Sequence, residues 1–218
     1  MEVLRISEIF HSIQGEGRRA GERCAFVRLH GCGLRCTWCD TPYALDHKEG
    51  GKFMDPQEII DEVESMNCRF VEFTGGEPLE QEACFPLMTQ FCDLGYIVAV
   101  ETGGHVDIGT VDPRVSVIMD LKCPTSGMQK KNRLSNIGFL KPGDELKFVL
   151  QNRADYDWAK DFIAEHSNEL SEQLLLFSPV YGALDNKQLA EWILQDRLPV
   201  RMQLQLHKYI WHPEARGV

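Results

Sequence analysis

Short apolar segments rich in Val, Ile, Leu and Phe recur along the whole chain, and helical patterns separate several of them. Strands are expected at residues 3–10, 24–30, 69–74, 96–102, 115–121, 145–150, 173–179 and 200–206. Strands that alternate with helices favour an α/β fold with a parallel sheet. Because 218 residues are too few for eight complete βα units, we expect a partial, open βα barrel whose site lies at the carboxyl ends of the strands.

The clearest helix is expected to begin after Asp55. Pro56 would occupy the first helical position, and Glu58 follows the cap by three residues, as in a capping box. Further helices are expected over residues 83–94, 154–167 and 187–195. Neither a repeat nor a flexible linker divides the sequence, so we expect one domain over residues 1–218.

Composition narrows the class of function. With 43% hydrophobic and 26% charged residues, the chain has the profile of a globular protein. It lacks an apolar run of membrane-spanning length, and its first residues lack the features of an export signal, so a cytoplasmic location is expected. The net charge of −10 repels nucleic acid on average. We therefore expect a small-molecule substrate, with neither a nucleic acid nor a membrane as partner.

Three of the eight cysteines have the spacing CxxxCxxC, namely Cys32, Cys36 and Cys39, in a loop directly after the strand expected at residues 24–30. In a reducing compartment such thiols are available as metal ligands rather than as disulfide partners. Three thiolates can hold a [4Fe–4S] cluster and leave one iron open to another ligand. The aromatic Trp38 favours a shielded cluster.

This cysteine motif, with an aromatic residue before its last cysteine, resembles the signature of the radical S-adenosylmethionine (SAM) superfamily. The resemblance continues at TGGEP, residues 74–78, because a GGEP segment at this place lines the methionine end of SAM in that superfamily. Two glycines also allow a ligand to approach the backbone closely. On its own, GGEP could be an ordinary turn between a strand and a helix. The resemblance implies a [4Fe–4S] cluster with three Cys ligands, and SAM.

Further segments are similar to the 7-carboxy-7-deazaguanine synthase family. They are EIFHSIQGEG (8–17), FVRLHGC (26–32), CDTPYA (39–44), ETGG (101–104), DLKCP (120–124), DELKFV (144–149) and LQLHKYIW (204–211). The resemblance implies a lyase that converts 6-carboxy-5,6,7,8-tetrahydropterin into 7-carboxy-7-deazaguanine with release of ammonia, in queuosine and 7-deazapurine biosynthesis. A reduced cluster would cleave SAM, and the resulting 5′-deoxyadenosyl radical would take a hydrogen atom from the substrate. The resemblance further implies Mg²⁺, a flavodoxin- or ferredoxin-type reductant and a homodimer.

The same resemblance assigns site residues. Substrate contacts would come from Ile13, Gln14, Gly15, Arg28, Thr74 and His207. SAM contacts would come from Thr37, Trp38, Cys39, Gly76, Glu101, Asp120, Leu121, Lys122, Ser178, Pro179, Val180 and Tyr181. Thr41 would bind Mg²⁺, with Asp40 as an alternative ligand. No side chain is assigned as catalytic, since the cofactor carries the radical. The cluster loop would span residues 31–41, and a segment at residues 207–218, after the last strand, would close over the substrate.

Other readings of these residues remain open. A glycyl-radical activating enzyme shares the cysteines and GGEP, although it has no use for IQGEG or HKYIW. A zinc-binding interaction protein without catalysis would need a fourth ligand, such as His30 or His47. Residues 13–15 could be a polar turn, Arg28 a surface residue of its strand, and His207 a cap of the last strand.

Overall fold

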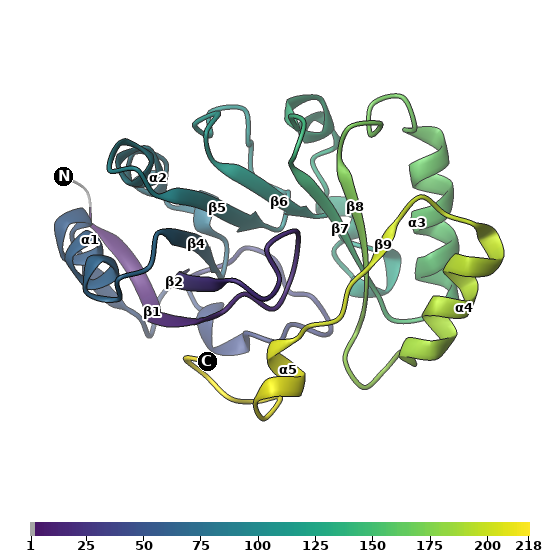
Figure 1. Ribbon diagram of the computed structural model, residues 1–218, viewed down its shortest axis with the longest axis horizontal. Coiled ribbons are helices and arrows are strands. Elements are labelled where there is room, and N and C mark those ends of the chain that lie inside the picture. Colours follow the sequence, from purple (N-terminus) through teal and green to yellow (C-terminus); the bar gives the residue numbers. More distant parts are fainter. Residues whose placement is uncertain (1–2) are drawn as a thin grey trace.

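The computed structural model describes residues 3–218, and its centre is a nine-stranded sheet in the order β3-β1-β2-β4-β5-β6-β7-β8-β9 (Figure 1). The strands are β1 (Leu4–Ile13), β2 (Arg23–Leu29), β3 (Lys52–Met54), β4 (Phe70–Gly75), β5 (Ile97–Thr102), β6 (Ser116–Asp120), β7 (Glu145–Leu150), β8 (Leu174–Pro179) and β9 (Arg201–Met202). Strands β2 and β4 to β9 run parallel to one another. With β3 and β9 at its two edges, the sheet is the open partial barrel that the sequence predicts.

The first strands depart from the parallel pattern. β1 pairs antiparallel with both β2 and β3, so the sheet begins with a hairpin rather than with a βα unit. The sequence analysis did not predict β3. Two of its three residues, Lys52 and Phe53, are exposed, and so short a segment carries no alternating signal.

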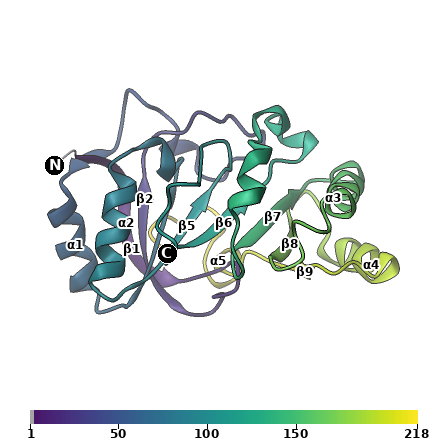
Figure 2. The ribbon, with the colours of Figure 1, turned by 90° about the horizontal axis from the view of Figure 1, so that it is seen from above.

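Four helices cover the outer side of the sheet, with α1 and α2 near β1 and β4, and α3 and α4 at the opposite end (Figure 2). They are α1 (Pro56–Ser65), α2 (Cys84–Asp93), α3 (Arg153–Glu165) and α4 (Asn186–Asp196), each within a few residues of its prediction. The expected capping box of α1 is present: Glu58 N donates to Asp55 Oδ1 at 3.0 Å, and Asp55 N donates to Glu58 Oε2 at 2.9 Å. Within residues 3–218, none of the helices has the length and apolar character needed to cross a membrane.

The two faces of the sheet differ in chemistry. The outer face packs its apolar side chains against the helices, whereas a small separate group that includes Phe26, Phe70 and Ala99 fills the inner face toward the amino ends of the strands. Because successive side chains of a strand point to opposite faces, Glu72 and Thr74 follow Phe70 on the inner face of β4. The inner face therefore changes from apolar to polar toward the carboxyl ends of the strands.

The last expected strand, residues 200–206, is wrong in its extent. Only Arg201 and Met202 pair with β8, and His207 begins a short helix, α5 (His207–Ile210), instead of ending a strand. After β9 the chain crosses toward the turn that follows β1, where Leu206 N donates to Gly15 O at 3.1 Å (Figure 1). The alternation of polar and apolar residues over 200–206 therefore does not mark a strand along its whole length. Its second half belongs to a segment that crosses the open side of the barrel.

Candidate active site

The three predicted cluster ligands lie on the loop that follows β2. Cys32 is buried, Cys36 and Cys39 are half-buried, and all three thiols are free. Cys39 N donates a hydrogen bond to Cys36 O at 3.3 Å. The hydroxyl of Thr37 donates to Thr125 O at 2.9 Å, which fastens this loop to the segment that follows β6.

The surroundings of the thiols bear on their ability to bind iron. Burial raises the pKa of Cys32 to about 12 and also raises the pKa values of Cys36 and Cys39, while the nearby Lys122 ammonium lowers all three. In residues 3–218 no three metal-ligating side chains converge into a ready-made ion site. The donor set fits a [4Fe–4S] cluster nonetheless, because such clusters are held by Cys thiolates, and metal binding displaces the thiol protons.

Neither candidate for a fourth zinc ligand is directed at these thiols. Both ring nitrogens of His30 are engaged, Nδ1 with Ser7 Oγ at 2.7 Å and Nε2 with Glu49 O at 2.7 Å. His47 Nε2 faces the Glu80 carboxylate at 3.5 Å. These contacts weigh against a zinc site built from the cysteine loop.

The TGGEP segment brings the end of β4 against the start of the cluster loop. A Cβ atom on Gly76 would overlap the Gly31 carbonyl, so this close approach of two backbones requires glycine. Glu77 is buried, and its carboxylate accepts hydrogen bonds from Thr102 Oγ1 at 2.8 Å and from Gly103 N at 2.7 Å. Glu77 therefore ties TGGEP to ETGG, the loop after β5.

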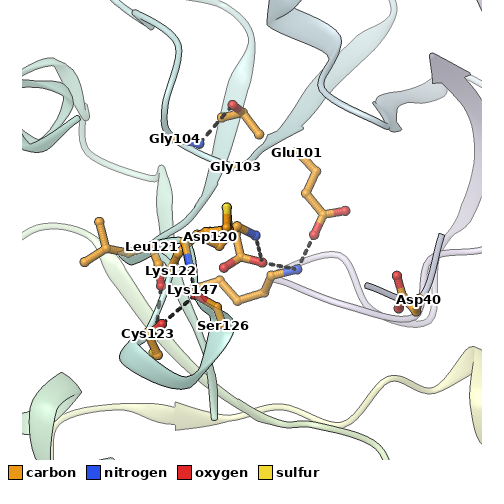
Figure 3. Close-up of polar contacts among 12 residues, drawn as sticks. Asp40, Glu101, Gly103, Gly104, Asp120, Leu121, Lys122, Cys123, Ser126 and Lys147 are labelled. Carbon is orange, nitrogen blue, oxygen red and sulfur yellow. Dashed lines mark hydrogen bonds and ion pairs between the residues drawn. The ribbon is translucent and has the colours of Figure 1, made fainter. Parts of the chain in front are cut away.

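A buried lysine connects the carboxyl ends of several strands (Figure 3). Lys147 Nζ on β7 forms an ion pair with Glu101 on β5 and lies 3.1 Å from Glu16 Oε2 and 3.9 Å from Asp120 Oδ2. Thr74 Oγ1 on β4 donates to Glu101 Oε2 at 3.1 Å. Burial acts to raise the pKa of Glu101, but the Lys147 charge and the hydrogen bonds from Lys147 and Thr74 together outweigh it and lower that pKa. An ionised Glu101 thus stands between the residues assigned to substrate and those assigned to SAM.

The DLK segment after β6 forms a second polar group beside the first. Lys122 Nζ lies 3.0 Å from Asp120 Oδ2, and the Asp120 charge keeps the pKa of this lysine raised although burial acts to lower it. Asp120 Oδ1 is buried with no hydrogen-bond partner among the described residues. Leu121 is buried in the core, and its backbone N donates to Lys147 O at 2.9 Å. An unpaired carboxylate oxygen at this place suits a hydroxyl or amino donor of a ligand.

The residues after β1 that the resemblance assigns to the substrate lie beside the C-terminal segment. Ile13 ends β1, and a Cβ atom on Gly15 would overlap the His207 ring. The Gln14 amide is fixed on both sides, because Nε2 donates to Glu72 and Oε1 accepts from Glu16 N at 3.0 Å. Residues from the two ends of the sequence therefore share one wall of the site.

The cluster loop is joined to the C-terminal segment through Asp40. Its carboxylate accepts hydrogen bonds from Thr41 Oγ1 at 3.0 Å, from Lys208 Nζ at 3.1 Å and from Gln205 Nε2 at 3.2 Å. Burial acts to raise the pKa of Asp40, but the Lys208 charge and these hydrogen bonds outweigh it and lower that pKa. With Asp40 engaged by Lys208, the Thr41 hydroxyl keeps its oxygen lone pairs for another partner.

The remaining residues that the resemblance assigns to SAM lie at the end of β8 and in the turn after it. Ser178 is buried and Tyr181 is exposed, and the turn between them borders a cavity of about 410 Å³. Leu204, Gln205 and Tyr209 of the C-terminal segment line its other side. The cavity therefore opens between the strand end and the bridging segment.

Sequence reasoning missed three charged residues of the site. Glu16, Glu72 and Lys147 were named only within longer motifs or strands, without a role. A signal was present for two of them, because Glu72 and Lys147 are charged residues that stand between apolar neighbours inside buried strands. A charge in such a position is costly to bury and marks a functional or paired group.

Comparisons with known proteins agree with this geometry. The profile of the Radical SAM superfamily matches residues 26–122. The 7-carboxy-7-deazaguanine synthase of Chlorobaculum tepidum is 50% identical over 218 residues, which cover 99% of this chain and 97% of that protein. The enzyme of the same name from Koribacter versatilis is 41% identical, over 99% of this chain and 100% of that protein. The crystal structure of QueE from Escherichia coli shares the fold, with a TM-score of 0.76 and 21% identity over 93% of this chain and 94% of that one. The chain belongs to the 7-carboxy-7-deazaguanine synthase family of the radical SAM superfamily.

Proposed function

We propose that this chain converts 6-carboxy-5,6,7,8-tetrahydropterin into 7-carboxy-7-deazaguanine with release of ammonia, as a step of queuosine and 7-deazapurine biosynthesis. The observation that carries this proposal is the 50% identity, over nearly the whole of both chains, to a relative of that name. The polar inner face at the carboxyl ends of the strands supports it, since this is where barrels of this kind bind their ligands.

Cys32, Cys36 and Cys39 would hold the [4Fe–4S] cluster. SAM would lie between the cluster loop, Gly76 and the carboxyl ends of β5, β6 and β8. When bound, the cluster and SAM supply the radical that removes a hydrogen atom from the pterin. The protein orients the two molecules and excludes water around them. Buried Lys147 supports this arrangement, because it fixes Glu101 and stays close to Asp120.

The substrate would lie on the inner face of β1, β2 and β4. Arg28 would hold its carboxylate, because a guanidinium binds carboxylates in a bidentate manner. Ile13, Gln14, Gly15 and Thr74 would contact the ring system. Burial lowers the pKa of His207, so the neutral imidazole can both donate and accept a hydrogen bond beside Gly15.

Mg²⁺ would bind to the Thr41 hydroxyl together with substrate oxygens and water, a ligand set that this hard cation accepts. The three hydrogen bonds to Asp40 favour Thr41 over Asp40 as the protein ligand. Residues 1–218 would act as one domain, and residues 207–218 would close the site. A flavodoxin- or ferredoxin-type reductant, a homodimer and a cytoplasmic location complete the proposal.

The decisive experiment is anaerobic reconstitution with iron and sulfide, followed by an assay with the carboxytetrahydropterin, SAM, Mg²⁺ and a reductant. We expect 7-carboxy-7-deazaguanine and ammonia in equal amounts, and neither product when SAM or the pterin is left out. A reconstituted enzyme that cleaves SAM and yet never converts the pterin would overturn the proposal.

A further inference from the structure

Glu72 has no place in the roles described so far, although it lies inside the site. It is 4% exposed and stands on the inner face of β4, two residues before Thr74. Its neighbours in register are Phe26 on β2 and Ala99 on β5, which are both apolar. A carboxyl group among such residues costs stability unless it has a partner.

The partners of Glu72 within the protein are few. Among residues 3–218 its one side-chain hydrogen bond comes from Gln14 Nε2. Lys147, whose charge lowers the pKa of Glu72, forms its ion pairs with Glu101, Glu16 and Asp120 instead. Each carboxyl oxygen can accept two hydrogen bonds, so most of this acceptor capacity is left for a ligand. Burial, together with the charges of Glu101 and Glu16, raises the pKa of Glu72, which is the expected result of such incomplete pairing.

The depth of Glu72 fits the dimensions of the proposed substrate. Arg28 and Thr74 are paired neighbours at the mouth of the barrel. Glu72 lies two residues deeper, about 6.6 Å along the strand. A pterin whose carboxylate is held by Arg28 would extend inward by a similar length. Its inner end then carries two adjacent donors, the 2-amino group and N3–H.

We propose that Glu72 recognises the pterin by accepting hydrogen bonds from its 2-amino group and N3–H, while Gln14 holds the Glu72 carboxyl in place. This inference rests on the proposed function and identifies the residue that selects an aminopyrimidinone ring. Two donors from the ligand would lower the raised pKa of Glu72 again, because hydrogen bonds to a carboxylate favour its charged form. The bound carboxylate then matches two parallel donors in the same fork geometry with which it meets a guanidinium.

The test compares two ligands that differ at the recognised edge. They are the carboxytetrahydropterin and its lumazine counterpart, in which an oxo group replaces the 2-amino group. Equilibrium binding to the reconstituted protein is measured anaerobically without SAM, so that no turnover occurs. We expect wild type to bind the pterin at least about 100-fold more tightly, because the lumazine presents an acceptor to an acceptor. In Glu72→Gln we expect the preference to fall below about tenfold, since a Gln amide can donate to the oxo group.

A matched control is Glu145→Gln. Glu145 is another buried carboxylate of the inner face, but both of its oxygens already accept hydrogen bonds from Arg18 N, at 3.0 and 3.1 Å. This variant should keep the wild-type preference.

Should Glu72→Gln fail to fold or to hold iron, Glu72→Asp serves in its place, because it keeps the charge and withdraws it by one methylene. We expect Glu72→Asp to weaken pterin binding about tenfold while it still rejects the lumazine.

The outcomes separate this inference from the proposed function. If wild type converts the pterin but Glu72→Gln keeps the full preference, the role of Glu72 is wrong and the function stands. Unchanged pterin affinity in Glu72→Asp would reject the role in the same way. If wild type neither binds nor converts the pterin, the proposed function itself fails.

Discussion

Glu8 and Arg28 lie directly opposite each other on β1 and β2, and the Glu8 carboxylate accepts a hydrogen bond from Arg28 Nε at 2.8 Å. Tyr43 OH donates to the same carboxylate oxygen at 2.7 Å. Because Nε is the one guanidinium nitrogen of Arg28 that is hydrogen-bonded within residues 3–218, the two terminal nitrogens stay available for a second carboxylate. Glu8 thus orients Arg28 before a substrate arrives.

Glu8→Ala should therefore raise the KM for the carboxytetrahydropterin about tenfold, the effect of losing one charge-assisted hydrogen bond that positions the guanidinium. The effect on kcat should be smaller, since the pterin ring keeps its other contacts. Steady-state kinetics of the reconstituted enzyme measure both values. Tyr43→Phe, which leaves the Glu8–Arg28 pair intact, is the control and should change KM less. An unaltered KM in Glu8→Ala would show that the pair does not position the substrate.

Replacing the buried cation should lower stability strongly. Lys147→Met leaves Glu101, Glu16 and Asp120 without their shared partner, and breaking a buried ion pair costs about 3–5 kcal/mol. Chemical denaturation under anaerobic conditions measures the loss in free energy of unfolding. Lys187→Met, which removes an exposed pair with Glu191, should be nearly neutral. Equal losses in the two variants would contradict the central place given to Lys147.

The cluster assignment has its own test. Cys32→Ala, Cys36→Ala and Cys39→Ala should each abolish the iron–sulfur absorbance and reductive SAM cleavage, because a methyl group cannot replace a thiolate ligand. Cys68→Ala is the matched control, since Cys68 is buried and its thiol makes weak hydrogen-bond contacts with Arg23 O at 3.3 Å and Phe70 O at 3.4 Å. Iron and sulfide analysis measures the result. A variant without the three loop cysteines that still held iron and sulfide would remove the cluster from this loop.

One variant tests the proposed Mg²⁺ site independently of the cluster. Thr41→Ala should reduce turnover and weaken its dependence on Mg²⁺, because the hydroxyl addresses the cation and not iron. Iron content and SAM binding should stay normal. Titration of activity with Mg²⁺ in both proteins is the measurement, and identical Mg²⁺ curves would exclude Thr41 as a ligand.

Stability should fall in mild acid through His207. Burial is the largest cause that lowers the pKa of His207 below its ordinary value of 6.5, and Lys208 adds to it. Below the ordinary value the unfolded chain binds more protons at this residue than the folded one, so the contribution of His207 to stability decreases as the pH falls toward its folded pKa. His207→Gln cannot titrate and should lose less stability between about pH 7.5 and about pH 5.5. Melting temperatures of both proteins at the two pH values decide the point, and parallel losses would contradict it.

Local signals in the sequence predicted some elements well. Asp55, Pro56 and Glu58 define the start of α1 within a few residues, and the structure has both hydrogen bonds of that capping box. The prediction of a strand over residues 200–206 was wrong beyond β9, because the Gln side chains there bind a residue that is distant in sequence. Gln203 and Gln205 both donate hydrogen bonds to Glu16, at 2.8 and 2.9 Å. Such partners lie far apart in sequence, so no local pattern reveals them.

The same reason explains which parts of the site were predicted. Loop motifs such as the three cysteines and TGGEP are contiguous and can be read directly. The Lys147 network joins residues from a loop and three strands and becomes visible only when the sheet is formed. The role inferred for Glu72 likewise depends on its hydrogen bond with Gln14, which directly follows β1 and is distant from Glu72 in sequence.

The hydrogen bonds that Glu77 accepts from Thr102 and Gly103 have a consequence for engineering. Because its buried carboxylate joins the loop after β4 to Thr102 and Gly103, the two loops form a single exchangeable unit. Consider a chimera in which a relative supplies residues 74–80 while residues 101–105 stay those of this chain. The carboxylate of the transplanted loop would then have to find its hydrogen-bond donors in a loop that did not come with it, or stay buried without them. Loop transplantation between members of this family should therefore move both segments together.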